Sequence, residues 1–211
     1  MDYPDYTKPE VQQWVKSLGP TFFREIGLEK GQTVLDFGCG VGNYSLPAAI
    51  SVGSTGRVYA LNKVGGSDDD PIAHLIPRAE AAGLEKIIIP IKTSGELAIN
   101  LPDYSIDLIL LLDVLPGLLV TELKTASPQQ PDLLIMFIQE LYRVLTNGGR
   151  LLVTLQHMEQ TECSSHKYNF SLKAIIAEIQ TQLDYIEVKT MQMLHWDFFE
   201  EETVYIFQKR S

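Results

Sequence analysis

Cysteine is scarce in this chain of 211 residues, in which Cys39 and Cys163 are the two that occur. Two thiols cannot build a disulfide framework, and they cannot supply a four-thiolate zinc site. Compact metal-ligand spacings such as H-x-x-x-H and C-x-x-C are missing as well. We therefore predict no metal centre, and we expect both thiols to be reduced, as is usual in the cytoplasm.

Positive charge is also in short supply. The chain has 17 Lys and Arg against 27 Asp and Glu, which gives a formal net charge of −10. A protein whose main partner is a nucleic acid usually presents a basic surface that replaces the counterions of the phosphate backbone. The net negative charge thus argues against nucleic acid as the main partner. It does not exclude a local basic patch that binds nucleic acid.

The sequence lacks a long apolar run. Residues 1–10 are acidic and tyrosine-containing, without the basic start and apolar stretch of a secretory signal. The longest apolar stretch, 106–120, is interrupted by Asp107, Asp113 and Pro116 and is too short to cross a bilayer. We expect no membrane segment and a cytoplasmic location.

What the chain does contain is a regular alternation of short apolar runs with amphipathic segments. The apolar runs predict strands at 33–37, 57–61, 87–91, 106–112 and 150–155. Helical patterns lie between and around them, at 9–18, 21–26, 43–50, 71–82, 132–145 and 171–182. We expect Asn43 to cap the helix 43–50 and Asp132 to cap the helix 132–145, which Asn147-Gly148-Gly149 should end.

This alternation predicts a parallel sheet covered by helices on both faces. The last two apolar runs, 185–191 and 203–208, have no helix between them and should pair antiparallel. Residues 1–211 are therefore expected to form a single α/β domain with a Rossmann-like, doubly wound, mostly parallel seven-stranded sheet and a C-terminal antiparallel hairpin. Within it, residues 1–30 form an N-terminal helical segment, either packed on the domain or acting as a lid.

A glycine-rich loop follows the first predicted strand, in the run Asp36-Phe37-Gly38-Cys39-Gly40-Val41-Gly42. Open α/β sheets bind ligands at this carboxyl edge, where glycines let the backbone approach a ligand closely. The spacing is G-x-G-x-G, and Asn43 stands where a dinucleotide fingerprint needs its third glycine. A nucleoside-triphosphate loop of the type G-x-x-x-x-G-K-[ST] is absent.

Four segments together resemble the class I S-adenosylmethionine-dependent methyltransferases, in the branch known as methyltransferase domain 11 or ubiquinone/menaquinone-biosynthesis-like. The resemblance covers roughly residues 20–155. It is carried by the segments 33–42, 57–63, 101–107 and 141–149, the last reading Leu141-Tyr142-Arg143-Val144-Leu145-Thr146-Asn147-Gly148-Gly149. The resemblance implies S-adenosyl-L-methionine as cofactor and transfer of its methyl group.

The resemblance also implies roles for single residues. Asp36 would face the methionine amino end of the cofactor, directly or through water, and the loop would lie under its methionine and ribose. The end of the fourth strand would border the methionine moiety. The cofactor-binding residues implied in this way are Asp36, Gly38, Cys39, Gly40, Gly42, Asn62, Lys63, Thr93, Ser94, Leu112 and Asp113.

Two of these positions depart from the family pattern. Asn62 stands where most relatives have an Asp or Glu that accepts from both ribose hydroxyls, and Thr93 and Ser94 stand near an acidic position beside the adenine amino group. Hydrogen bonds to a charged group are about twice as strong as neutral ones, so binding should persist but weaken by about 1–2 kcal/mol for each lost acid.

Methyl transfer from a sulfonium needs mainly proximity and orientation, and some acceptors also need a general base. His157, a few residues after the fifth predicted strand, is our candidate catalytic base. His166, Tyr168, His195 and Trp196 are read as loop or edge residues, and Tyr6 and Trp14 as packing residues that could instead belong to a lid. The Asn/Asp-Pro-Pro-aromatic motif and the Pro-Cys nucleophile of DNA methyltransferases are absent, which favours a small-molecule acceptor.

Three functions remain open from the sequence. The leading one is an S-adenosylmethionine-dependent methyltransferase acting on a small molecule. The second is a catalytically weakened protein that binds S-adenosylmethionine or S-adenosylhomocysteine in a regulatory or interaction role, which the neutral Asn62 motivates. The third, a nicotinamide-dependent oxidoreductase, is disfavoured by the missing third glycine and by the terminal hairpin. The acceptor and the oligomeric state are not fixed by the sequence.

Overall fold

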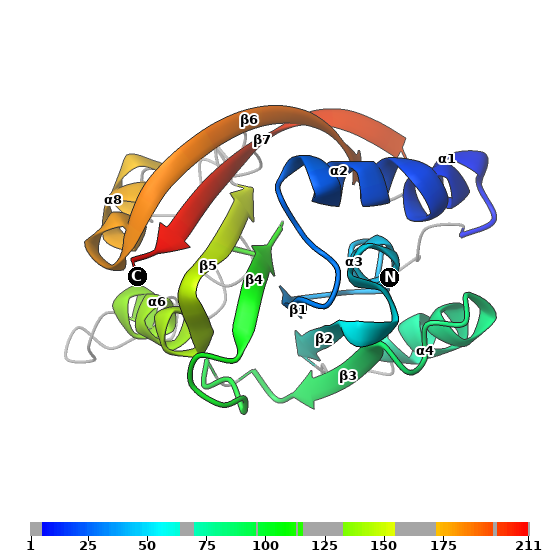
Figure 1. Cartoon of the computed structure of the whole chain (residues 1–211), viewed down its shortest axis with the longest axis horizontal. Helices are drawn as coiled ribbons and strands as arrows, with labels where there is room; N and C mark the ends of the chain where they lie inside the picture. Colours follow the sequence, from blue (N-terminus) through cyan, green and yellow to red (C-terminus); the bar gives the residue numbers. More distant parts are fainter. Residues whose placement is uncertain are drawn as a thin grey trace, which may run out of the picture. The chain divides into compact units, whose positions relative to one another are not determined.

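A computed structural model describes residues 6–63, 70–95, 97–112, 114–115, 133–154, 172–195 and 198–210 (Figure 1). The chain divides into two compact units. The first comprises residues 1–96 and 190–202, and the second comprises residues 97–189 and 203–211. The assignment of all 211 residues to a single domain stays a prediction.

Within the described residues, seven strands make up a mixed α/β fold. The helices are α1 (Pro9–Gln13), η1 (Trp14–Leu18, a π-helical turn), α2 (Gly19–Glu25), α3 (Ser45–Val52), η2 (Gly53–Thr55), α4 (Pro71–Ala81), α6 (Leu133–Val144) and α8 (Leu172–Gln182). The strands are β1 (Thr33–Phe37), β2 (Arg57–Lys63), β3 (Ile88–Thr93), β4 (Ile106–Leu111), β5 (Leu145–Thr154), β6 (Leu183–His195) and β7 (Phe198–Lys209). Their order in the sheet is β3-β2-β1-β4-β5-β7-β6. The predicted fold class, a Rossmann-like and mostly parallel sheet with a C-terminal antiparallel hairpin, is confirmed.

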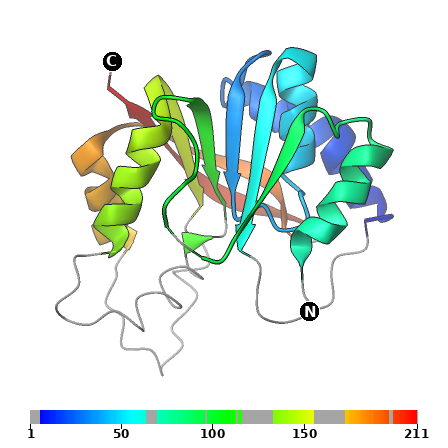
Figure 2. The same ribbon diagram turned by 90° about the horizontal axis from the view of Figure 1, so that it is seen from below.

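The first unit is built on the parallel strands β1, β2 and β3. The β1–β2 register runs from Thr33 opposite Arg57 to Phe37 opposite Leu61. Val34 and Leu35 of β1 are fully buried, as expected for a strand of a parallel sheet with both faces covered. The connections between these strands contain α3 and α4, and α4 lies beside β3 (Figure 2). All three strands therefore end at the same edge, where β1 leads into the glycine loop.

The N-terminal helices pack on the same unit. Trp14 is fully buried, and its ring contacts those of Phe22 and Tyr44, with centroids 5.8 Å and 5.6 Å away. Its indole Nε1–H donates to the backbone oxygen of Asn43 at 2.8 Å. Trp14 is thus a core side chain, which agrees with the packing interpretation of this residue. A lid role for residues 1–30 stays a prediction.

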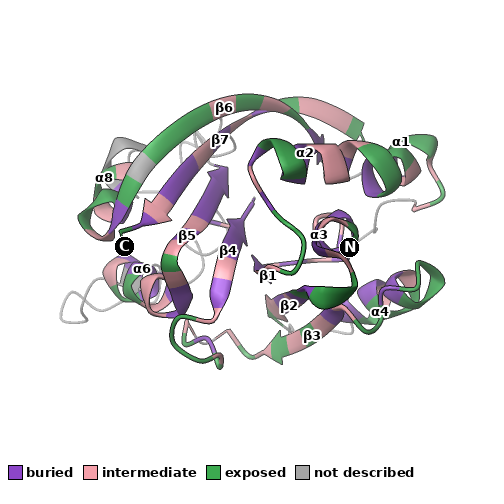
Figure 3. Ribbon diagram, viewed as in Figure 1, coloured by how far each residue is buried: buried purple, intermediate pink, exposed green. Residues whose placement is uncertain are grey.

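The second unit contains the parallel pair β4–β5, and β7 pairs antiparallel with β5. Strand β4 and the second half of β5 are mostly buried (Figure 3), and Ile109, Leu110, Leu151, Leu152 and Val153 are fully buried. Long apolar side chains on both faces of β4 and β5 explain why this part of the sequence reads as uninterrupted apolar runs.

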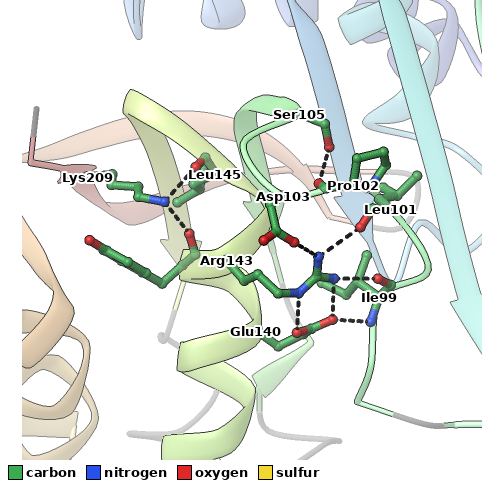
Figure 4. A network of polar contacts seen from close by, with 10 residues as sticks. Ile99, Leu101, Pro102, Asp103, Ser105, Glu140, Arg143, Leu145 and Lys209 are labelled. Atoms are coloured by element: carbon green, nitrogen blue, oxygen red, sulfur yellow. Dashed lines mark hydrogen bonds and ion pairs between the residues drawn. The ribbon is translucent and has the colours of Figure 1, made fainter.

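Arg143 at the end of α6 holds the segment that leads into β4 (Figure 4). Its guanidinium donates to the backbone oxygens of Leu101 at 3.0 Å and Ile99 at 2.8 Å, and to the carboxylates of Asp103 and Glu140. Glu140 in turn accepts from the backbone N–H of Ile99 at 2.6 Å. One side chain of the Leu141–Gly149 segment thereby fixes part of the Leu101–Asp107 segment.

Lys209 of β7 caps the end of α6. Its Nζ donates to the backbone oxygens of Tyr142 at 2.7 Å and Leu145 at 2.8 Å, and it lies 4.0 Å from the ring centroids of both Tyr104 and Tyr142. The residue is 2% exposed, and burial lowers the pKa of its ammonium. The cation therefore satisfies carbonyls that a helix end leaves without partners.

Several predicted boundaries shift by a few residues. The helix expected from Asn43 begins at Ser45, and its N-cap Tyr44 makes no side-chain capping bond, so the capping role predicted for Asn43 is wrong. The helix expected to include Leu145 ends at Val144, ahead of Asn147-Gly148-Gly149, because Leu145 already belongs to β5. Asp132 lies outside the described residues. In the ranges that the structure describes, no helix combines the length and the hydropathy needed to cross a membrane.

Candidate functional site

The glycine loop Gly38–Gly42 joins the end of β1 to α3. The backbone N–H groups of Gly38 and Cys39 both donate to the oxygen of Leu61 in β2, at 2.8 Å and 2.9 Å. Gly42 closes a turn through its N–H to the oxygen of Cys39 at 2.9 Å, and its own oxygen accepts from Leu46 in α3 at 3.0 Å. The loop is therefore fixed at both ends, to the neighbouring strand and to the following helix.

The three loop glycines have positive φ, at +78° for Gly38, +52° for Gly40 and +87° for Gly42. Gly40 and Gly42 differ in how much space a side chain would find at each position. A methyl group placed on Gly42 would come within 2.2 Å of Leu75 Cδ1, whereas one placed on Gly40 would meet no atom within 4 Å. Gly42 is thus required for packing against α4, and Gly40 leaves open space over the backbone, as a ligand-binding loop needs.

Asn62 connects the loop to the end of β2. Its Oδ1 accepts from the backbone N–H of Gly40 at 3.0 Å, and its Nδ2 donates to the oxygen of Lys63 at 2.8 Å. The amide therefore uses one acceptor and one donor to hold the protein's own backbone. A side-chain amide has a second acceptor lone pair and a second N–H, which remain for a ligand.

Asp36, the last residue but one of β1, lies in the interior at 3% exposure. Its Oδ2 accepts from the hydroxyl of Ser45 at 2.5 Å, and Ser45 is itself fully buried at the start of α3. Burial raises the pKa of the Asp36 carboxyl to about 6, although the bond from Ser45 opposes this shift. A carboxylate of this kind can hold a negative charge beside the loop at neutral pH while it gains strongly from a cationic ligand.

Cys39 is buried in the loop, and burial together with the nearby Asp36 raises the pKa of its thiol well above its ordinary value. A protonated, buried thiol is a poor nucleophile. Lys63 and Thr93 are opposite each other at the ends of β2 and β3. The Thr93 hydroxyl accepts from the N–H of Gly95 at 3.1 Å, and Ser94 lies exposed between them.

Arg78 of α4 supports the loop from a direction that the sequence did not reveal. Its Nη1 donates to the backbone oxygen of Val41 at 2.6 Å and to Asn43 Oδ1 at 3.0 Å. Its guanidinium carbon lies 4.1 Å from the ring centroid of Tyr6, and burial lowers the arginine's pKa to about 10, which leaves it charged at neutral pH. No local motif marks an arginine whose partners lie 35 and 37 residues away.

The first unit therefore brings together most of the predicted cofactor residues. Asp36, Gly38, Cys39, Gly40 and Gly42 lie at the end of β1, Asn62 and Lys63 at the end of β2, and Thr93 and Ser94 at the end of β3. Leu112 follows β4 in the second unit and is buried. Asp113 and the candidate base His157 lie outside the described residues, as do His166, Tyr168 and Trp196. The described ranges hold no group of three or more His, Cys, Asp or Glu arranged to bind a metal ion.

Comparison with curated proteins finds short similar segments in methyltransferases. One is a probable cobalt-precorrin-6B C(15)-methyltransferase (decarboxylating) of Saccharolobus solfataricus, 36% identical over 55 residues, which is 26% of each chain. Another is the 23S rRNA (uracil(1939)-C(5))-methyltransferase RlmD of Acinetobacter baylyi, 59% identical over 34 residues, which is 16% of this chain and 7% of that protein. The matched segments thus span about a quarter or less of these relatives, and no family model matches the chain.

Solved structures extend the likeness to nearly the whole chain. An S-adenosylmethionine-dependent methyltransferase from Aquifex aeolicus aligns with a TM-score of 0.62 over 96% of this chain and 94% of that one, at 19% identity. This likeness and the strand order give the chain the fold of the class I S-adenosylmethionine-dependent methyltransferases, as the sequence predicted. The more specific branch, methyltransferase domain 11, stays a prediction.

Proposed function

We propose that this chain is an S-adenosylmethionine-dependent methyltransferase that binds its cofactor at the glycine loop of the first unit. The observation that carries the proposal is the loop itself, fixed to Leu61 at one end and to α3 at the other, with open space over Gly40. This loop follows β1, at the sheet edge where open α/β folds bind ligands. S-adenosyl-L-methionine is the expected cofactor of a chain with this fold.

The residues present fit such a cofactor. The open backbone at Gly40 can accept a ribose or methionine group at close range. Asp36 provides a negative charge that suits an ammonium group, directly or through water, and its near-complete burial strengthens that attraction. Asn62 is near enough to the loop to engage a ribose hydroxyl with the lone pair and N–H that Gly40 and Lys63 do not use. Gly38, Cys39, Gly42, Lys63, Thr93 and Ser94 are further residues of this unit that the resemblance assigns to the cofactor. The roles of Leu112 and Asp113 stay predictions from the resemblance.

Bound S-adenosylmethionine would supply a methyl group already activated on a sulfonium. The protein would then contribute mainly position, since a fixed donor and acceptor turn a bimolecular displacement into an effectively unimolecular one. The hydrogen bonds of Asn62 and Arg78 to the loop serve this purpose, because each limits the movement of backbone under the cofactor. We keep His157 as the proposed general base for acceptors that must lose a proton.

For the acceptor we propose a small molecule. The net charge of −10 supports this choice, because a polyanionic acceptor would be repelled on average. The relatives named above modify a cobalt-precorrin in one case and 23S rRNA in the other, so both acceptor classes occur among methyltransferases with similar segments. A structured RNA is therefore the control acceptor in the assay described below.

A second candidate function is cofactor binding without efficient turnover. It is favoured by the commitment of Asn62 Oδ1 to the Gly40 N–H, in a position where relatives have a carboxylate, and by the neutral Thr93 and Ser94. Such a protein would bind S-adenosylmethionine and its demethylated product without consuming the first.

Titration calorimetry with S-adenosylmethionine, S-adenosylhomocysteine and NAD separates these functions. Saturable heat with both sulfur compounds and none with NAD is the expected result, and absence of heat with both would refute both candidate functions. The purified protein is then incubated with methyl-labelled S-adenosylmethionine and small-molecule acceptors grouped by hydroxyl, amine, thiol and carbon nucleophile, with ribosomal RNA as the control. Label transfer supports the enzyme, whereas binding without transfer in any group supports the second candidate.

A further inference from the structure

The two outer strands of the sheet, β3 and β6, are protected very differently against pairing with another strand. An edge strand presents a row of backbone N–H and C=O groups that can template further pairing. The edge strand β3 has six residues, and Pro90 interrupts it with a missing donor. The edge strand β6 has 13 residues, from Leu183 to His195, and contains no proline or glycine.

The middle of β6 also exposes apolar side chains. Ile186 is 49% exposed and Val188 is 43% exposed, and both belong to the short set of large apolar residues at the surface of the described chain. Because they are two residues apart, they lie on the same face of the strand. Glu187 and Lys189 lie on the opposite face, where the lysine Nζ is 3.2 Å from Glu187 Oε2.

We propose that β6 is an interface at which two copies of this chain pair, edge to edge and antiparallel, about a twofold axis through Val188. This register places Val188 opposite its own copy and Ile186 opposite Thr190 of the second copy. It also places Glu187 opposite Lys189 of the second copy, and Lys189 opposite Glu187, so that the pair found within one chain becomes two pairs between chains. Directly opposed charges of unlike sign stabilise a strand pair.

The charges select this register over its neighbours. A twofold axis perpendicular to the sheet keeps each residue on its own face, so the central residue must lie opposite itself. An axis at Glu187 would oppose two glutamates, and an axis at Lys189 would oppose two lysines; like charges directly opposite destabilise a pair. With the axis at Val188, the positions further along the strand, such as Asp184 with Gln192, bring no like charges together.

The isologous arrangement leads to a charge-swap experiment. Glu187→Lys and Lys189→Glu are each measured by light scattering after gel filtration over a concentration series, with the wild type for reference. Glu85→Lys and Lys86→Glu, two exposed neighbours ahead of β3, serve as matched controls for charge. Thermal unfolding of every variant establishes that it is folded.

We expect the wild type to have twice the 23.7 kDa mass of one chain, and each β6 variant to weaken the dimer at least tenfold, whereas the controls remain dimeric. An equimolar mixture of the two β6 variants should form a dimer again, because the two lysines of one chain then lie opposite the two glutamates of the other. The double variant Glu187→Lys/Lys189→Glu should dimerise with itself, since each lysine again meets a glutamate of the second copy.

A wild type that stays at the single-chain mass at every concentration overturns the proposal. Dimers unaffected by either β6 variant, or a mixture of the two that stays monomeric, overturn it as well, because a different surface or register would then hold the copies together. The proposal is independent of the cofactor site. Calorimetry with S-adenosylhomocysteine on the same samples therefore shows whether a failure concerns the interface or the methyltransferase function.

Discussion

The side-chain oxygen of Asn62 accepts a hydrogen bond from the backbone N–H of Gly40 at 3.0 Å. This bond ties the end of β2 to the middle of the glycine loop, at a loop glycine with open space around its Cα. The position is thus both a support for the loop and a candidate partner for a ribose. Substitutions can separate these two tasks.

Asn62→Asp keeps an acceptor for Gly40, gives up the Nδ2–H bond to the Lys63 oxygen, and adds a charge that can take a second hydrogen bond from a ribose hydroxyl. We expect it to tighten S-adenosylhomocysteine binding about fivefold, since bonds to charged groups are worth about 1 kcal/mol more than neutral ones. Asn62→Ala removes the support and should weaken binding about tenfold. Calorimetry measures both, with Asn100→Asp as an exposed control of the same charge. Equal affinity of Asn62→Asp and wild type would argue against a ribose contact here.

Substitution by alanine should affect mainly stability at Gly42 and mainly ligand affinity at Gly40. The Cβ of Gly42→Ala would collide with Leu75, so we expect a loss of about 2–3 kcal/mol in the free energy of unfolding. Gly40→Ala meets no atom and should cost only about 1 kcal/mol for its left-handed backbone, but its methyl group enters the ligand's space. Chemical denaturation and calorimetry measure stability and affinity on the same samples. If Gly40→Ala bound as tightly as wild type, the ligand would not approach this backbone.

Asp36 should make stability depend on pH in an unusual direction. Its carboxyl has a pKa near 3.8 when unfolded and about 6 when folded. Between these values the folded protein keeps a proton that the unfolded chain has lost, so the free energy of unfolding falls as the pH rises from about 4 to 6. The fall should be about 3 kcal/mol, and it should level off above pH 6.

The variant Asp36→Asn retains an acceptor for Ser45 but has no charge to bury. Denaturation curves from pH 4 to about 7 should therefore show a smaller fall for Asp36→Asn than for wild type. Affinity for S-adenosylhomocysteine should behave inversely in the wild type and rise with pH through about 6, since the ammonium of the ligand favours the ionised carboxylate. Identical pH profiles of the two proteins would show that Asp36 does not titrate in this range.

We expect Arg143 to contribute to the free energy of unfolding but not to ligand binding at the glycine loop. Arg143→Met leaves the carbonyls of Ile99 and Leu101 and the carboxylate of Glu140 without this partner, so we expect a loss of about 2–3 kcal/mol in the free energy of unfolding. Arg57→Met is the control, since Arg57 makes an exposed bond of 3.3 Å to the oxygen of Lys86 and should lose less than about 0.5 kcal/mol. Denaturant unfolding compares the two, and equal losses would contradict this role of the Arg143 network.

Periodicity and glycine spacing were sufficient to predict the fold. β1 was predicted to the residue, at 33–37, because a short apolar run ends there in glycines. The helix 71–82 was placed closely because Pro71 and Gly83 mark its ends, and the structure adds an N-cap, since the Asp70 side chain accepts from Ile72 N–H. These signals are local, and local signals are what a single sequence shows best.

Contacts between distant residues could not be predicted in this way. Asn43 resembled a helix cap, yet its Oδ1 accepts from Arg78, and its backbone oxygen accepts from Trp14. The start of β5 at Leu145 was missed because the same apolar residues continue the helical pattern of α6 until pairing with β4 decides between them. Likewise, the sequence identified Asn62 as a departure from the family pattern but could not show that its oxygen holds Gly40.

The central claim, that the glycine loop binds S-adenosylmethionine, is tested most directly by titration calorimetry of the wild type and Gly40→Ala with S-adenosylhomocysteine. The account predicts saturable one-site binding to the wild type and a loss of at least about tenfold in affinity for Gly40→Ala, whose free energy of unfolding should fall by only about 1 kcal/mol. Absence of binding to the wild type, or equal binding to both proteins, would contradict it.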